Sequence, residues 1–258
     1  MDRSPAPAEL LAGPQLGDAF GALLLQCWEH GGAAGQVLEF VERDDGYLAA
    51  ADAARYFAAP EAWDRLHTWA CTQVQGRVLD IGSGAGRHAL PLQHIGHDVV
   101  ALDVSPGATE VCRRRGVRQT VTGTLADLRA QGAPSFNTLL LLGNNLGLLE
   151  TAKQARTVLR TLADLAAPDA VLIGEGRDPY ATTQPLHLAY HQHNRARGRL
   201  PGQIRMRVRH QHLATPWFDY LFLSVEELQG LVAGSAWRME QCEREGASYI
   251  VLLRRAPS

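Results

Sequence analysis

The 258-residue sequence predicts an α/β fold built on a parallel sheet. Between residues 75 and 177, short apolar runs alternate with segments of helical periodicity. The first of these runs leads directly into a glycine-rich turn. Parallel strands need crossover connections, which are usually helices. The alternation therefore favours right-handed βαβ units with helices on both faces of the sheet.

The composition is that of an ordinary folded, soluble protein. Apolar residues make up 46% of the chain and charged residues 20%, with a formal net charge of -2. This near-neutral balance disfavours extensive binding to nucleic acid or to anionic membranes. No apolar run approaches the ~20 residues of a membrane span. The first residues lack the pattern of a secretory signal, and the four cysteines form no CxxC pair. We therefore expect a cytoplasmic protein with reduced thiols and no membrane partner.

The first 74 residues are predicted to form a tail and a helical cap. Residues 1–15 are rich in Pro, Ala and Gly, which is typical of a mobile tail. Apolar residues recur at helical spacing over 16–30, where Gly31 and Gly32 end the pattern. A second helical zone is predicted over 49–72.

Residues 75–177 are predicted to form the core of the sheet. The helix after the first strand contains Pro91, which cannot donate to residue 87. That helix therefore either begins later than the glycine turn suggests or kinks at Pro91. Gly96 is well placed as its left-handed cap. A helix is predicted over 153–166, and strands over 77–81, 98–103, 119–122, 136–142 and 170–175.

The alternation stops after the fifth strand. Residues 178–223 are polar at first and then contain two extended segments, 203–213 and 217–223. Ser224 opens a predicted helix that runs to about residue 233. Residues 237–242 and 249–253 are expected to pair antiparallel, so that 224–258 complete the core sheet.

The glycine turn carries the most specific signal. Asp80 is followed by Gly82, Gly84 and Gly86, which gives the spacing GxGxG. The dinucleotide fingerprint GxGxxG would place its third glycine at Arg87, where helix and strand must approach closely. This disfavours an NAD(P)-dependent oxidoreductase. Asp103 closes the second strand about twenty residues further on, and a carboxylate there can accept both hydroxyls of a ribose.

The sequence resembles class I S-adenosylmethionine-dependent methyltransferases of the bacterial small-molecule type. The resemblance lies in Asp80, the GxGxG spacing that follows it, and Asp103 at the end of the second strand. The resemblance covers about residues 75–177 and the last thirty or so. It implies a doubly wound, Rossmann-like sheet of seven mostly parallel strands. An N-terminal helical cap and an antiparallel lid, inserted after the fifth strand, would cover it. It implies S-adenosyl-L-methionine (SAM) as cofactor and methyl transfer to oxygen or nitrogen of a small molecule or peptide.

The resemblance also assigns cofactor contacts. Asp80 should face the cationic methionyl end, Asp103 the ribose and Val104 the adenine. Asn144, after the fourth strand, should lie beside the methionyl group and the transferred methyl, and Tyr56 either closes over the cofactor or packs in the core. The full expected set is Tyr56, Asp80, Gly82, Ser83, Gly84, Asp103, Val104, Thr124, Leu125 and Asn144.

The end of the fourth strand narrows the substrate class. Enzymes that methylate nucleobase amino groups carry Asp/Asn-Pro-Pro-Tyr/Phe there, whereas this chain has Gly143-Asn144-Asn145. No cysteine follows a proline, which disfavours C5-cytosine chemistry. Small molecules, peptides and unusual RNA sites remain open, and a monomer and a homodimer are equally compatible with the sequence.

The insertion is expected to bind the substrate. Arg205, Arg207 and Arg209 alternate with apolar residues, which places three guanidinium groups on one face of a strand. This face is either solvated or binds a carboxylate or phosphate of the substrate, with a nucleic-acid groove as a third option. The expected substrate contacts are Arg177, Tyr180, Tyr190, Asn194, Arg205 and Trp217.

Three residues are candidates for a general base. His187 and His191 are four residues apart and titrate near neutrality, and Glu175 ends the fifth strand. No neighbouring Cys or HExxH pattern supports a metal site, so none is expected. A non-catalytic SAM- or nucleotide-binding sensor and an RNA-directed methyltransferase remain alternatives to the small-molecule enzyme.

Overall fold

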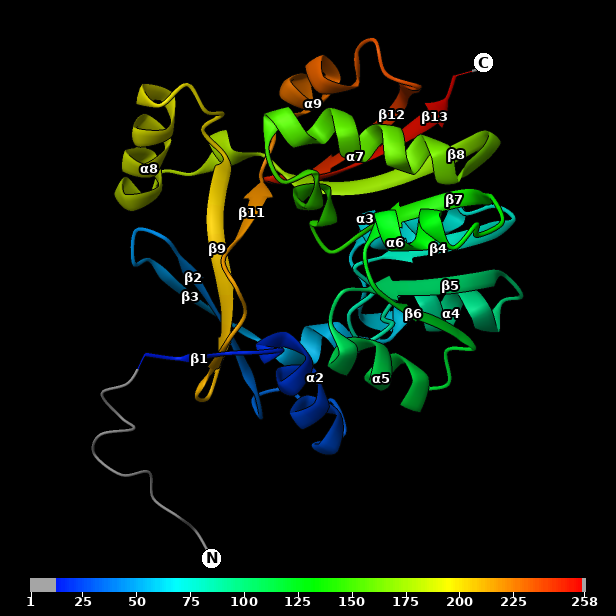
Figure 1. Ribbon diagram of the computed structural model, residues 1–258, viewed down its shortest axis with the longest axis horizontal. Helices are drawn as coiled ribbons and strands as arrows, with labels where there is room; N and C mark the ends of the chain where they lie inside the picture. Colours follow the sequence, from blue (N-terminus) through cyan, green and yellow to red (C-terminus); the bar gives the residue numbers. More distant parts are fainter. Residues whose placement is uncertain (1–12, 257–258) are drawn as a thin grey trace, which may run out of the picture.

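The computed structural model describes residues 13–256, in which two sheets face one another (Figure 1). Most of the predicted N-terminal tail, residues 1–12, lies outside the described residues. No helix within residues 13–256 is both long enough and apolar enough to cross a membrane.

The larger sheet has seven strands among the described residues, in the order β12-β13-β8-β7-β4-β5-β6. The strands β8, β7, β4, β5 and β6 are parallel, and β13 is antiparallel to both β8 and β12. This confirms the predicted doubly wound sheet and its antiparallel completion. The bounds are β4 (Arg77–Ile81), β5 (Asp98–Asp103), β6 (Gln119–Thr122), β7 (Phe136–Leu141), β8 (Ala166–Arg177), β12 (Trp237–Glu245) and β13 (Ser248–Arg255).

Helices cover both faces of this sheet, each over its own apolar cluster. The cluster on one face includes Leu159 and Leu228, and the cluster on the other includes Leu66 and Leu92. The covering helices are α3 (Arg65–Thr72), α4 (Ala89–His94), α5 (Pro106–Arg114), α6 (Leu125–Ala130), α7 (Ala152–Leu165) and α9 (Val225–Val232).

Pro91 does not kink its helix, because α4 begins only at Ala89. Pro91 therefore lies in the first turn, where a missing amide removes no intrahelical bond. The chain between Gly82 and Ala89 is a turn that keeps backbone groups at the sheet edge. This late start resolves the alternative that the sequence left open.

The smaller sheet has six strands among the described residues and forms the lid. Its long strand β9 (Gln203–His210) pairs with β2 (Leu38–Arg43), β10 (Leu213–Ala214) and β11 (Phe218–Leu221). The edges are β1 (Gln15–Leu16) and β3 (Leu48–Asp52). Two helices, α2 (Ala19–Glu29) and α8 (Pro185–Ala196), lie beside it, and the short 3-10 helices are η1 (Ala53–Phe57), η2 (Pro60–Ala62), η3 (Asn145–Leu149) and η4 (Pro179–Ala181).

The N-terminal cap is only partly helical, which corrects the predicted helical zone over 49–72. The strands β2 and β3 form an antiparallel hairpin. The strand β2 also pairs antiparallel with β9, for example Val41 with Val208. The Ala-rich segment 49–51 has high helix propensity, but pairing with a distant strand overrides it. The cap and the insertion therefore share one sheet.

Candidate active site

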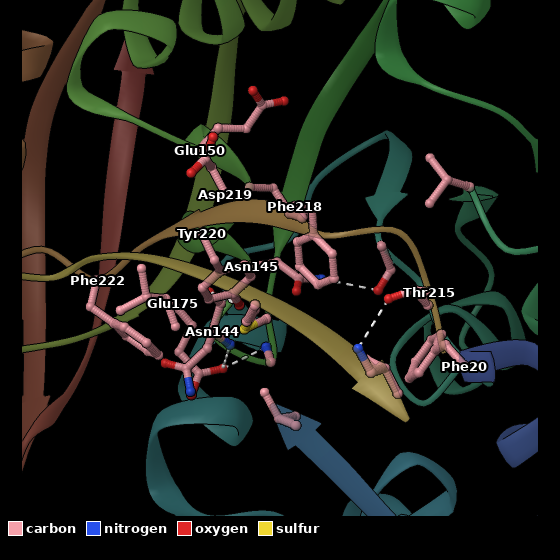
Figure 2. Close-up of a pocket in the computed structure, with 18 of the residues that line it drawn as sticks. Phe20, Asn144, Asn145, Glu150, Glu175, Thr215, Phe218, Asp219, Tyr220 and Phe222 are labelled. Atoms are coloured by element: carbon pink, nitrogen blue, oxygen red, sulfur yellow. Dashed lines mark hydrogen bonds between the residues drawn. The ribbon is translucent and has the colours of Figure 1, made fainter. Parts of the chain in front are cut away.

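A cavity of about 1940 Å³ lies between the carboxyl edge of the parallel sheet and the lid sheet (Figure 2). Its walls come from the glycine turn, the ends of β5, β7 and β8, and the inner face of β9. Ligand pockets usually measure roughly 300–1,000 Å³. This cavity therefore has room for two small molecules side by side.

The glycine turn approaches the neighbouring strand end through Asn145, which donates to the carbonyls of Ile81 (2.9 Å) and Gly82 (3.0 Å). Gly82 has a φ of 67°, and a Cβ there would lie 2.5 Å from the Asn145 amide nitrogen. Only glycine combines this left-handed conformation with so close an approach.

Asp103 holds the opposite side of the turn. Its carboxylate accepts the amides of Gly84 and Ser105, each at 2.9 Å. Burial, partly offset by these amides, raises its pKa. The next residue, Val104, is 68% exposed and lines the cavity, so an apolar surface for a flat ring adjoins a carboxylate.

Asp80 lies beneath the turn rather than on the cavity wall. It is 2% exposed, and its Oδ2 has no hydrogen-bond partner. Burial, together with the nearby Asp103, raises its pKa to about 7. Such a carboxyl group would be stabilised in its charged form by a cation above the turn.

Asn144 lies in the turn after β7, in a left-handed conformation with a φ of 68°. Glu175 Oε2 accepts the amides of Gly143 (2.6 Å) and Asn144 (3.1 Å). The Tyr220 hydroxyl donates to the carbonyl of Asn144 at 2.6 Å. The turn is therefore held from the core by Glu175 and from the lid by Tyr220 (Figure 2).

The side chain of His67, on α3, contacts the Glu175 carboxylate. Its Nε2 lies 3.1 Å from Glu175 Oε2, and the two groups form an ion pair when the imidazole is protonated. Its Nδ1 lies 2.9 Å from Asp64. Burial alone would lower the pKa of His67, but Glu175 and Asp64 outweigh it and raise the pKa. Burial likewise opposes ionisation of Glu175, but His67 and the two amides outweigh it and lower the pKa.

Tyr56 lines the cavity and also packs against a cluster of buried apolar residues. Its hydroxyl donates to Glu39 Oε1 at 3.0 Å, and Arg55 also pairs with Glu39. Its ring meets Phe20 edge-on at 5.3 Å. Burial, with Glu39 nearby, raises the pKa of Tyr56 and keeps it neutral.

His187 and His191 both line the cavity, from one side of α8. Burial lowers the pKa of each, so both imidazoles are neutral at pH 7. The His187 Nδ1 lies 3.1 Å from the Thr182 hydroxyl. Within the described residues, no group of three or more His, Cys, Asp or Glu is arranged to hold a metal ion.

The structure brings eight of the ten expected cofactor residues to the cavity wall, all except Asp80 and Gly84. Gly84 follows the cavity residue Ser83 in the glycine turn. Its amide donates to the carboxylate of Asp103, which also lines the cavity. Thr124 caps α6 and Leu125 opens it, both at the cavity edge.

Of the six expected substrate residues, only Arg177 lines the cavity. Arg205 was placed wrongly, because the inner face of β9 carries Ile204, Met206 and Val208 while the arginines point away from the cavity. The other four serve the lid itself: Tyr180 bonds Glu227, Tyr190 bonds Asp44, Asn194 bonds the carbonyls of Pro201 and Gln203, and Trp217 lies against the Arg207 guanidinium.

Several cavity residues carried no signal in the sequence. His67 sits among apolar residues of a short helix, and its partner Glu175 is 108 positions away (175 - 67). Tyr220 and Glu39 belong to lid strands whose inner face depends on non-local pairing. For Asn145 a signal did exist, since it adjoins Asn144 at a strand end.

Comparisons with known proteins agree with this geometry. Residues 78–169 match the family described as methyltransferase domain. A SAM-dependent methyltransferase from Bacteroides fragilis, solved in complex with S-adenosyl-L-homocysteine, is 25% identical, with 98% of each chain covered and a TM-score of 0.78. Two others share the fold: a Methanosarcina mazei SAM-dependent methyltransferase (14% identity; 76% of this chain and 99% of that one; TM-score 0.58) and the CcbJ methyltransferase from Streptomyces caelestis (13%; 76% and 94%; 0.58). No curated protein matches the sequence.

The parallel sheet, the glycine turn and the carboxylate that ends β5 define a Rossmann-like α/β fold with a ligand site at the carboxyl edge of the sheet. The family match and the Bacteroides structure add the activity and the cofactor class to this fold. Residues 78–169 match a methyltransferase domain, and the similarity to the Bacteroides enzyme over 98% of the chain supports a class I SAM-dependent methyltransferase.

Proposed function

We propose that this methyltransferase transfers the methyl group of SAM to an oxygen or nitrogen of a small molecule or peptide in the cavity beneath the lid. The observation that carries the proposal is the size and position of that cavity. It is too large for one small ligand and opens between the glycine turn and an apolar lid face. We assign residues 75–177 to cofactor binding, 224–256 to completing the core sheet, and 13–74 with 178–223 to enclosing the acceptor.

The residues present fit the cofactor. Val104 offers an exposed apolar surface for the adenine, and Asp103 a carboxylate for the ribose hydroxyls. The unpartnered Asp80 oxygen under the turn suits the cationic methionyl end, directly or through water. When bound, SAM supplies an electrophilic methyl group on a sulfonium.

The chain contributes chiefly by positioning and by excluding water. Methyl transfer is an in-line displacement in which charge disperses, so a dry and aligned pocket favours it. The inner face of β9, with Ile204, Met206 and Val208, supplies the apolar side of that pocket. His187 and His191 are neutral and able to accept a proton where the acceptor begins protonated.

Calorimetry combined with a transfer assay tests the proposal. We expect S-adenosyl-L-homocysteine to bind and NAD to show no heat of binding. Tritiated methyl from SAM should then appear in the small-molecule fraction of a metabolite extract and be absent from purified RNA. Binding without transfer to any fraction would indicate a sensor, and NAD binding would overturn the assignment.

A further inference from the structure

We infer that the acceptor is an amine, whose nitrogen is held by Glu175 and Asn144 at the end of β7. This inference rests on the proposed methyl transfer and names the acceptor for that same site. The observation behind it is a pair of adjacent hydrogen-bond acceptors with nothing bonded to them.

Glu175 uses only one of its carboxylate oxygens. Oε2 accepts the amides of Gly143 and Asn144 and faces the His67 imidazole. Among the described residues, no hydrogen bond or ion pair involves Oε1, although Glu175 lines the cavity. The carboxylate is therefore fixed through one oxygen and offers the other to a ligand.

Asn144 supplies the second acceptor. Its amide and carbonyl are used by Glu175 and Tyr220, and its Oδ1 is buried without a hydrogen-bond partner. A buried acceptor without a donor costs about 1–3 kcal/mol, so a bound N–H group would relieve that cost. Glu175 and Asn144 line the same cavity and are joined by the Asn144 amide, so their two free acceptors suit a group with two N–H bonds.

The charge on Glu175 favours nitrogen over oxygen as the nucleophile. A hydroxyl must lose its proton to a base, but His67 and two amides hold the pKa of Glu175 low and make it a poor base. An amine that binds as an ammonium ion loses one proton to water far more readily than an alcohol does, and the neutral amine then has a lone pair and needs only orientation. As the N–C bond forms, the C–S electrons pass to sulfur, and the nitrogen gains a positive charge next to a fixed carboxylate. The nitrogen then loses one proton to water.

The proposed function assigns the cofactor's own ammonium to a different carboxyl group, that of Asp80 beneath the glycine turn, directly or through water. The rest of the acceptor contacts the lid, whose inner face at Ile204, Met206 and Val208 is apolar. We therefore expect an amine on an apolar or aromatic body.

Paired fragments test this inference in protein loaded with S-adenosyl-L-homocysteine. Benzylamine and benzyl alcohol have similar shapes and differ in the group that meets Glu175. We expect benzylamine to bind about tenfold more tightly at pH 7.5, the effect of one hydrogen bond to a charged group. Dissociation constants come from ligand-observed NMR titration. Equal binding of both fragments, or no binding of benzylamine, overturns the inference.

Variants tie the preference to the two acceptors. Glu175→Gln turns an NH₂ toward the cavity and should abolish the preference for benzylamine, whereas Glu150→Gln, at an exposed carboxylate of the same cavity, should keep it. Asn144→Gly accommodates the left-handed backbone and should weaken benzylamine alone, which provides a second test if Glu175→Gln does not fold. A preference that survives both substitutions contradicts the inference. Failure of the wild type to bind S-adenosyl-L-homocysteine would instead refute the proposed function.

Discussion

The hydroxyl of Tyr220 donates to the backbone carbonyl of Asn144 at 2.6 Å, across 76 positions of the chain. The bond joins the lid strand β11 to the turn that follows β7 (Figure 2). The ring reaches this position because it packs over Gly147, where a Cβ would lie 2.0 Å from the ring. The lid and the candidate catalytic edge are therefore one packed unit.

Tyr220→Phe tests that unit. The ring is kept, and the Asn144 carbonyl keeps the Gly147 amide as a donor but loses the hydroxyl, so we expect the free energy of unfolding to fall by about 0.5–1.5 kcal/mol. Turnover should fall more than cofactor affinity, because the turn beside the methyl group loosens. Urea denaturation and steady-state kinetics measure the two effects. Tyr180→Phe, which removes an exposed bond to Glu227, should change stability little, and an equal loss in both variants would contradict this account.

Gly147→Ala should lower the free energy of unfolding strongly, although it adds only one methyl group. The added methyl overlaps the Tyr220 ring, and overpacking of this kind costs about 3 kcal/mol. Gly230→Ala is the matched control, because Gly230 lies in α9 and a Cβ there meets nothing within 4 Å. That control should gain about 0.5–1 kcal/mol from helix propensity. Thermal unfolding of both variants decides, and a tolerated Gly147→Ala would mean that the lid packs differently.

Binding of S-adenosyl-L-homocysteine should depend on pH through Asp80. Burial raises the pKa of this carboxyl group to about 7 in the free protein, and a cationic ligand lowers it again. Binding below pH 7 therefore releases a proton, so affinity should rise with pH up to about 7 and then level off. Calorimetry from pH 5.5 to 8, in two buffers of different ionisation enthalpy, measures the proton release. Asp80→Asn should flatten the profile, and a persistent slope in that variant would assign the proton elsewhere.

Val104 should contribute apolar contact to the adenine. The side chain is 68% exposed in the free protein, so Val104→Ala should leave stability unchanged and weaken S-adenosyl-L-homocysteine by about threefold. Ile95→Ala removes a similarly exposed side chain outside the cavity and should have no effect on binding. Equal affinities in the wild type and Val104→Ala would remove Val104 from the site.

The parallel sheet was predictable from sequence because its signals are local. All of its parallel strands except β6 contain a short apolar run, and the glycine turn and Asp103 lie at fixed spacings from the first strand. The hairpin of β2 and β3 was not predictable, since it is stabilised by pairing of β2 with β9 about 165 positions away. Its Ala-rich second strand has helical propensity on its own.

The cofactor side and the acceptor side of the site also differ in how far the sequence predicts them. The residues proposed to contact the cofactor follow strand ends, so the sequence could predict that Asp103, Val104 and Asn144 lie at the carboxyl edge of the sheet, where they line the cavity. The acceptor side depends on which face of β9 points inward. Alternation predicted that Arg205 and its neighbours share a face, but the sequence could not show that this face points away from the cavity. His67 was missed because its partner comes from another element.

Affinity of S-adenosyl-L-homocysteine for the wild type, Asp103→Asn and Asp103→Ala tests the central claim most directly. Asp103 is the carboxylate that the glycine turn positions, through Gly84, for the ribose. Calorimetry should show binding to the wild type, a partial loss in Asp103→Asn and a loss of roughly 100-fold in Asp103→Ala, since two charge-assisted hydrogen bonds disappear. Circular dichroism should show that all three are folded. An Asp103→Ala protein that is folded and binds as tightly as the wild type would contradict the account.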